Sequence, residues 1–434
     1  MGLTTDGPLL YGQLAQLREL EELPAASRSE NNRVASIRLP PGTTVAAVRS
    51  ALKILCVRHE SLRTTYDLSR PRSPRQVMHD PRSVPDAVRW DGPVEAAADR
   101  IGALHAEAFD LRNEFAWRLR ILAEGSNTTH LVLIYHHIAT DAFGLQVFRR
   151  DLLEALGRSP DSATGGAAYS LVTLARQQRM TTSAAQLRQV RHWESVLAGE
   201  ARVGIVGLYD GAVGPVLLGH LTSRRWRTAA ERVASTSGTS IASVILTAYA
   251  CALRGVHYME AVPIRLASAN RFSAKWKDFI ALSTQWMPLG LEVPWKAGFR
   301  GLVETVHSRS VRAHSLGGYD IDTTADLCGV PVRQLTGLGM KYAFNYIPTS
   351  IADPLPPVDE SRLDAIQWEE LPAATVYRGL YLKVVEHHDS WYIALTGMGV
   401  DRDVVEAVLG GISDAMFCGD EKFHERKRSG NPGA

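Results

Sequence analysis

The spacing of apolar residues predicts alternating helices and strands in the first half of the chain. Over residues 45–60, apolar side chains recur at the three- and four-residue spacing of a helix that buries one face, and Thr43–Thr44 can cap its start. Residues 129–135 form a continuous apolar and β-branched run, which is typical of a strand buried on both faces. A second helix is predicted after Asp141, which can cap it, and Gly157 can end it. The first half therefore has the pattern of an α/β unit.

The second half of the chain repeats this alternation. The predicted elements are a helix over 237–254, strands near 261–267, 283–293 and 341–347, a hairpin made of 378–386 and 391–396, and a helix over 402–416. Residues 158–168 are rich in Ser, Gly and Pro, as linkers are. We therefore predict an N-terminal α/β lobe over residues 1–175, a C-terminal α/β lobe over 176–417 and a disordered tail over 418–434.

Composition limits the classes of function. With 434 residues, the chain is long enough for roughly two hydrophobic cores. It has 48 basic and 46 acidic residues, so neither nucleic acid nor an anionic membrane is an expected partner. Its four cysteines include no Cys-x-x-Cys pair, which argues against a zinc site, an iron–sulfur cluster and a disulfide framework. We find no signal peptide and no apolar run near the roughly 20 residues of a membrane helix. The expectation is a cytoplasmic monomer.

The segment from His136 to Asp141 carries the clearest chemical signal. It follows a predicted buried strand and precedes a predicted helix, and such junctions lie at the rim of an α/β sheet, where ligands commonly bind. Adjacent side chains of a strand point to opposite faces, so at most one of His136 and His137 can face a given cleft. A buried structural histidine followed by a helix cap at Asp141 is the alternative interpretation.

This segment resembles the His-His-x-x-x-Asp-Gly signature of the condensation domains of nonribosomal peptide synthetases and their acyltransferase relatives. The resemblance extends to four further segments, in matching order from about residue 8 to residue 415. These are Pro8–Gln13, the Arg-His-Glu-Ser-Leu-Arg-Thr-Thr-Tyr run of 58–66, Ala269-Asn270-Arg271 and Phe344-Asn345-Tyr346. Epimerisation domains share the His-His-x-x-x-Asp core.

The resemblance implies two lobes, each like chloramphenicol acetyltransferase, arranged in a V with a tunnel between them. It implies that a carrier protein, acting in trans, delivers an acyl group on its phosphopantetheine arm, and that a small-molecule amine or alcohol accepts that group. No bound cofactor and no metal are implied. His137 would be catalytic with His136 structural beside it, and Asp141 would position the segment by pairing with Arg271 across the lobes. The implied substrate-binding residues are Ala142, Gly144, Trp286 and Asn345.

Histidine suits this chemistry, because an imidazole that titrates near pH 6.5 can accept a proton at neutral pH. His137 can act as the base that removes a proton from the attacking amine. It can instead hold the acceptor or the tetrahedral intermediate by a hydrogen bond. The residues do not distinguish these roles.

Several positions depart from the family pattern. Ala142 replaces the glycine of the signature, Gly144 replaces a serine or similar residue, and Tyr169 lacks the aspartate expected two positions later. These departures leave the donor and acceptor undefined. We expect a freestanding condensation enzyme that forms an amide, or secondarily an ester. The alternatives are an acyl-CoA-dependent N- or O-acyltransferase and a non-catalytic platform that docks a carrier protein.

Two further motifs have simpler interpretations. His387-His388-Asp389 lies between two predicted strands, which is the position of a hairpin turn. Cys56 lies on the apolar face of a predicted helix, so a buried small side chain is expected there.

Overall fold

A computed structural model describes residues 5–82, 90–95, 98–124, 127–157, 170–180, 183–202, 213–273, 276–348, 359–375, 379–387 and 389–417. The predicted linker, the predicted tail, Tyr169 and His388 lie outside these residues. The chain divides into two compact units. The first comprises Met1–Thr182, Ala269–Gln285 and Gly318–Ile321, and the second comprises the remainder.

The first unit is built on a four-stranded sheet of order β2-β7-β6-β5. The strands are β2 (Asn32–Arg38), β7 (Asn127–His136), β6 (Trp117–Glu124) and β5 (Trp90–Glu95). Helices α2 (Val45–Arg58) and α5 (Ala142–Leu156) contact each other and share one hydrophobic core with this sheet. Helix α4 (Ala98–Ala106) packs Leu104 against Val132 and Ile134, which point the other way from the alternate residues in that core. The predictions of both helices and of the buried strand are confirmed.

Smaller elements complete the first unit around the strand end that carries the two histidines. A second sheet has the order β1-β4-β3. Its strands are β1 (Thr5–Pro8), β3 (Thr64–Asp67) and β4 (Arg75–Met78), and the helices are α1 (Tyr11–Glu22), α6 (Leu171–Arg179) and the short η1 (Ala25–Asn31), η2 (Glu60–Arg63) and η3 (His137–Ala139). Helix α1 contacts η3 and so lies beside the histidine segment.

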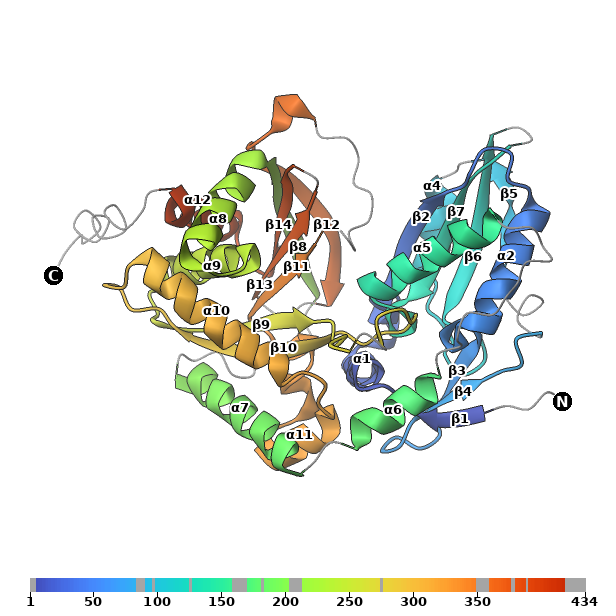
Figure 1. The fold of residues 1–434 in the computed structure, drawn as a ribbon, viewed down its shortest axis with the longest axis horizontal. Helices are drawn as coiled ribbons and strands as arrows, with labels where there is room; N and C mark the ends of the chain where they lie inside the picture. The colour runs from blue at the N-terminus through green and yellow to red at the C-terminus, as the bar shows by residue number, and fades with distance from the viewer. Residues whose placement is uncertain are drawn as a thin grey trace. The chain divides into compact units, whose positions relative to one another are not determined.

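The second unit is built on a seven-stranded sheet of order β10-β9-β11-β13-β14-β8-β12. These strands are β8 (Val213–Ser223), β9 (Ala261–Ser268), β10 (Gln285–Glu292), β11 (Tyr342–Ile347), β12 (Gln367–Thr375), β13 (Gly379–Glu386) and β14 (Trp391–Met398). In Figure 1, α8, α9, α10 and α12 gather on one side of this sheet. The helices of the unit are α7 (Ser183–Arg202), α8 (Arg224–Ser237), α9 (Ile241–His257), α10 (Phe299–Ser315), α11 (Ile321–Cys328) and α12 (Arg402–Phe417). The predicted hairpin is confirmed as the antiparallel pair β13–β14.

One predicted helix begins later than the periodicity indicates. The prediction was 237–254, whereas α9 begins at Ile241, with Ser240 as its cap, and ends at His257. Gly238 adopts the left-handed conformation, with φ of 63°, and ends the preceding helix α8. The prediction is wrong at this boundary because it joined the end of one helix to the start of the next.

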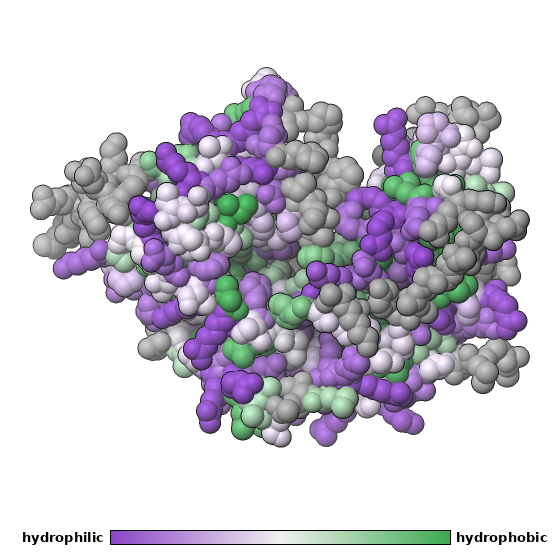
Figure 2. All heavy atoms as spheres, viewed as in Figure 1, coloured by the Kyte–Doolittle hydropathy of each residue, from purple (hydrophilic) through white to green (hydrophobic). Residues whose placement is uncertain are grey.

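None of the described helices is by itself long and apolar enough to cross a membrane. Only α8 and α9 together meet that length and hydropathy, and they are bent by 107° to each other. On the face seen in Figure 2, hydrophobic residues are scattered among hydrophilic ones. The most exposed large hydrophobic side chains of the described residues are Tyr258, Met180 and Phe272.

Candidate active site

The histidine segment lies where β7 ends and α5 begins. His136 is the last residue of β7, His137–Ala139 form one short turn, and Thr140 and Asp141 return to extended backbone. Asp141 then caps α5, because its Oδ1 accepts a hydrogen bond from the Gly144 amide at 2.9 Å. The predicted rim position of the segment and the predicted cap are confirmed.

His136 is a buried structural residue. Its Nδ1 accepts a hydrogen bond from the Ile138 amide at 3.1 Å, and its ring meets the edge of the Phe109 ring. Burial, together with the neighbouring His137 and Arg33, lowers the pKa of His136 to about 3. The ring is therefore neutral at physiological pH and shapes the turn that presents His137.

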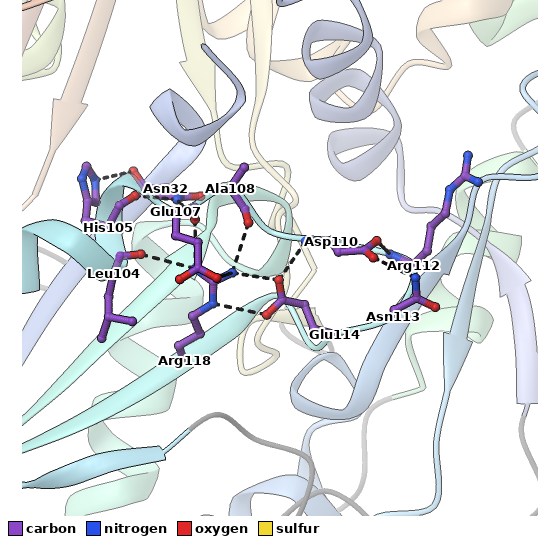
Figure 3. A network of polar contacts seen from close by, with 10 residues as sticks. All are labelled: Asn32, Leu104, His105, Glu107, Ala108, Asp110, Arg112, Asn113, Glu114 and Arg118. Carbon is purple, nitrogen blue, oxygen red and sulfur yellow. Dashed lines mark hydrogen bonds and ion pairs between the residues drawn. The ribbon is translucent and has the colours of Figure 1, made fainter. Parts of the chain in front are cut away.

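A buried arginine holds the segment that carries Phe109 (Figure 3). The Arg118 guanidinium lies 3.9 Å from the Phe109 ring centroid and pairs with Glu114 at 2.8 Å. It also donates to the carbonyls of Leu104, Glu107 and Ala108, at 2.9 to 3.3 Å. Arg118 thereby orders residues 104–109 and keeps Phe109 against His136. No sequence pattern singled out this arginine, because its partners are mostly main-chain carbonyls.

His137 is half-buried, and one ring nitrogen has a defined partner. Nδ1 lies 3.1 Å from the Thr140 carbonyl, which can only accept, so Nδ1 carries the proton. Nε2 is then left with a lone pair. Burial and, after it, the Arg33 charge lower the pKa of His137 to about 4. At neutral pH the ring is uncharged and able to accept a proton at Nε2.

Asp141 is a buried carboxylate that accepts from five donors. Besides the Gly144 amide, Oδ1 accepts from Arg271 Nη2 at 2.9 Å. Oδ2 accepts from the Ser283 amide at 3.0 Å, the Thr284 amide at 3.2 Å and the Thr284 hydroxyl at 3.1 Å. Burial would raise the pKa of Asp141, but Arg271 and the other donors outweigh it and lower the pKa. Asp141 stays ionised and holds residues 283–284 to the start of α5.

The Asp141–Arg271 pair lies inside the first compact unit. We expected it to join the two lobes, but residues 269–285 pack with the first unit. Arg271 also donates to three carbonyls of its own segment, those of Lys277, Phe279 and Ala281, at 2.9 to 3.1 Å. The guanidinium therefore shapes the segment that supplies Ser283 and Thr284 to Asp141.

Two glycines allow residues 280–284 to pack closely against helices α1 and α5. A Cβ atom on Gly12 of α1 would lie 2.8 Å from the Leu282 carbonyl oxygen, and one on Gly144 would lie 2.2 Å from Thr140 Oγ1 and 3.2 Å from the Ala281 nitrogen. The prediction that Gly144 binds substrate stays a prediction. The structure shows that Thr140 Oγ1 and the backbone of residues 280–281 leave no room for a side chain at this position.

Three distant sequence motifs are linked to the histidine turn or to the residues that bind Asp141. The Tyr66 hydroxyl donates to the Ile138 carbonyl at 3.5 Å and receives a hydrogen bond from Gln13 Nε2 at 3.4 Å. Asn270 adopts a left-handed backbone, with φ of 52°, and donates to the Ser283 carbonyl at 3.1 Å. Gln13, Tyr66 and Asn270 each belong to a segment of the predicted resemblance. Tyr66, bonded to Gln13, contacts the turn itself, whereas Asn270 holds Ser283, whose amide donates to Asp141.

A family model for the condensation domain matches residues 15–335 of this chain. The chain belongs to the condensation-domain family. It is 28% identical over 332 residues to CymA of Salinispora arenicola, a probable non-canonical nonribosomal peptide synthetase. That match covers 71% of this chain and 4% of the synthetase, so the chain spans only a small part of the relative's length.

Solved structures of condensation-type domains share the fold. The X-domain from teicoplanin biosynthesis has a TM-score of 0.71 at 19% identity and covers 95% of each chain. The condensation domain that mediates chain release from the enacyloxin polyketide synthase has a TM-score of 0.70 at 17% identity, covering 99% of this chain and 85% of the other. The predicted fold class, with chloramphenicol-acetyltransferase-like α/β lobes, is thereby confirmed.

The other predicted substrate residues of this condensation domain belong to different parts of the chain. Ala142 is half-buried in the first turn of α5, one residue after Asp141. Asn345 and Trp286 lie in the second unit, on β11 and β10. Asn345 Nδ2 donates to the Tyr381 hydroxyl at 3.1 Å, and the Trp286 ring meets the Tyr381 ring edge-on. Tyr381 thus joins both residues, although no motif had indicated it.

The remaining motif residues are accounted for by packing. Cys56 is buried on α2 as predicted, and burial raises the pKa of its thiol to about 12. His59 Nε2 lies 2.8 Å from Asp151 of α5, so the run 58–66 ties α2 to α5. Among the described residues, no group of three or more His, Cys, Asp or Glu side chains is placed to hold a metal ion.

The lowered pKa of His137 predicts that kcat/KM of this domain falls unusually little as the pH is lowered below neutral. An imidazole with an ordinary pKa of about 6.5 is mostly protonated at about pH 5.5, whereas His137 stays neutral until the pH falls toward 4. We therefore expect kcat/KM at about pH 5.5 to keep most of its value at about pH 7.5. An alcohol acceptor gives the cleanest measurement, because it does not titrate in this range. A fall in kcat/KM centred near pH 6.5 would contradict the expectation.

The close packing of residues 282–284 against Gly12 gives a prediction for stability. Gly12→Ala should lower the free energy of unfolding by about 1–3 kcal/mol, because the new methyl group meets main-chain atoms that cannot rotate away. Urea denaturation measures this. Gly102→Ala in α4 is the matched control, since a Cβ there meets nothing within 4 Å, and it should be neutral or slightly stabilising. Equal effects of the two substitutions would show that the close approach is not limiting.

Proposed function

We propose that this condensation domain forms an amide bond between an acyl or aminoacyl thioester and an amine acceptor, with ester formation as the secondary activity. The observation that carries the proposal is the state of His137. Its Nδ1 proton is directed at the Thr140 carbonyl, and its lowered pKa keeps Nε2 unprotonated. A neutral imidazole that is held in one tautomer is suited to receive a proton from an attacking nucleophile.

In the proposed reaction the acceptor nitrogen attacks the carbonyl carbon of the thioester. The N–C bond forms, the C–S bond breaks, and the thiolate leaves. His137 Nε2 takes the proton that the nitrogen loses, and the leaving sulfur receives a proton in return, which restores the neutral imidazole. Asp141 and His136 act through position, because each is buried and hydrogen-bonded to protein groups: His136 to the Ile138 amide, and Asp141 to Arg271.

A second role for His137 is consistent with the same geometry. Nε2 can accept a hydrogen bond from the acceptor and so fix its orientation, with proximity supplying most of the rate enhancement. Both roles need a neutral Nε2, so a solvent deuterium isotope effect on kcat separates them, because only a base takes the proton of the acceptor during the reaction.

We propose that the thioester is delivered on the phosphopantetheine arm of a carrier protein on another chain. The family match and the similarity to a nonribosomal peptide synthetase support this donor. The arm is part of the substrate, and the proposal includes no metal and no resident cofactor. A carrier that must dock and leave in each cycle is expected to use a small, weak interface.

The experiment that tests the proposal uses a panel of acyl and aminoacyl thioesters, each bound to a carrier protein and also as the coenzyme A thioester. Candidate amines and alcohols are added, and the products of the wild type and of His137→Ala are compared by mass spectrometry. A new amide or ester made by the wild type alone supports the proposal. Equal use of the coenzyme A thioesters would instead indicate an acyl-CoA-dependent acyltransferase. Carrier binding with no product from either protein would indicate a docking platform.

A further inference from the structure

An arginine on the neighbouring strand lies beside the proposed catalytic histidine. In the antiparallel pair of β2 and β7, Asn32 is opposite His136 and Arg33 is opposite Tyr135. Opposite residues share a face of the sheet, and the next position on that face beyond Tyr135 is His137. The backbone remains extended at His136, with φ of −74° and ψ of 139°, so this alternation carries on to His137. Arg33 and His137 are therefore diagonal neighbours at the rim of the sheet.

The hydrogen bonds of Arg33 leave one edge of its guanidinium free. Nη1 donates to the Glu30 carbonyl at 2.6 Å and to the Asn32 carbonyl at 2.8 Å. These bonds hold the group in place and use both protons of Nη1. The protons on Nε and Nη2 form the side-on fork that matches the two oxygens of a carboxylate. Among the described residues, no protein carboxylate pairs with this fork, and Arg33 is exposed.

Arg33 differs in this respect from the arginines that organise the first unit. Arg58 pairs with Asp151, Arg118 with Glu114 and Arg271 with Asp141, each at 2.8 to 2.9 Å. The charge of Arg33 is nevertheless felt at the site, since after burial it is the main cause that lowers the pKa of His137. An anion bound to Arg33 would thus lie close to the proposed reacting atoms.

We propose that Arg33 binds a carboxylate of the substrate, so that this domain selects a donor or acceptor with a carboxylate close to the reacting group. The inference rests on the proposed function, because it takes His137 as the point where the substrates meet. The phosphate of a pantetheine arm is not the proposed anion, since it lies at the opposite end of the arm from the thioester. The carboxylate belongs to the acyl group or to the acceptor, with a free amino acid as the simplest acceptor of this class.

The test compares substrates that differ only in charge. Its acceptor arm uses the proteinogenic amino acids as free acids and as methyl esters. Its donor arm uses succinyl-pantetheine and the corresponding methyl ester. In Arg33→Gln, kcat/KM for the carboxylate member of the productive pair should fall by about 10- to 100-fold, mainly through KM, because a charge-assisted bidentate contact is lost. The ester member should change by less than about threefold. If the loss occurs in the acceptor series, the acceptor carries the carboxylate; if it occurs in the donor series, the acyl group carries it.

The pairing of substrates separates recognition from general effects on the site. Removal of the Arg33 charge also changes the environment of His137, but this acts on the acid and the ester alike and cancels in their ratio. Arg38→Gln is the matched control, because Arg38 is an exposed arginine on the same strand, opposite His130 rather than the histidine pair. The inference would be overturned if Arg33→Gln lowers kcat/KM equally for acid and ester. It would also be overturned if the acid-to-ester ratio of kcat/KM is the same in Arg33→Gln and Arg38→Gln.

A binding measurement keeps the inference testable if the proposed reaction itself is not observed. Thermal shift with the same acid and ester pairs should show stronger stabilisation of the wild type by the acid, and Arg33→Gln should lose that difference. If the wild type binds no acid better than its ester, the inference is wrong whatever the outcome for catalysis. If the acid preference is present without turnover, the proposed function fails and the anion site stands.

Discussion

Alanine in place of His137 is expected to lower kcat by about 10²- to 10⁴-fold, which is the usual contribution of a positioned general base. The reason is that His137 is the side chain with an unprotonated nitrogen, Nε2, left over after the hydrogen bonds of its turn are made. Steady-state kinetics with the productive substrate pair measures the loss. The melting temperature should change little, because the ring is only half-buried and makes one hydrogen bond through its side chain.

His130→Ala is the matched control for this substitution. His130 lies on the same strand, β7, and is also half-buried, but it is opposite Arg38, six residues before His136. We expect its kcat to stay within about threefold of the wild type. If His130→Ala and His137→Ala reduce kcat alike, the loss comes from the strand and not from the base, and the assignment of His137 is contradicted.

Removal of the Asp141 carboxylate should cost about 3–5 kcal/mol in the free energy of unfolding, as breaking a buried ion pair does. In Asp141→Ala, Arg271 keeps its charge in a buried place, and the amides of Gly144, Ser283 and Thr284 lose their acceptor. Asp141→Asn should be milder, because the amide keeps one acceptor oxygen. Urea denaturation followed by circular dichroism measures both variants.

An exposed aspartate in residues 269–285, the segment of Arg271, provides the comparison for Asp141. Asp278 pairs with Arg150 at 2.7 Å, and both side chains are about half exposed. Because water screens such a pair, Asp278→Ala should cost no more than about 1 kcal/mol. If Asp141→Ala lowers the free energy of unfolding by no more than this, residues 280–284 are held by their close packing against Gly12 and Gly144 rather than by the carboxylate.

Local patterns predicted the elements that bury a continuous apolar face. Helices α2 and α5, strand β7 and the β13–β14 hairpin follow their periodicity closely, because each buries residues at a regular spacing. Helix α8 escaped prediction, since its buried residues are few and small apart from Trp226. The boundary between α8 and α9 depends on the left-handed Gly238, which a periodicity cannot reveal.

In the candidate site, too, some features could be predicted from local sequence and others could not. The position of His136 and His137 at the end of a strand, and the capping role of Asp141, could be predicted because both depend on a few adjacent residues. The close packing at Gly144 could not be predicted, since the atoms that fill the space beside it belong to Thr140 and to residues 280–281. The donors on Ser283 and Thr284 are main-chain groups for the most part, and no side-chain motif marks them.

The amino-acid sequence by itself determined the α/β class, the principal helices and strands, and the histidine segment with its cap. All of these depend on the spacing of neighbouring side chains. Only the tertiary structure decided that residues 269–285 pack with the first unit, that Gly12 and Gly144 make room for them, and that Arg33 lies beside His137. These features depend on contacts between segments up to about 270 residues apart along the chain. Such contacts are set by packing and strand register, which leave no periodic trace in the sequence.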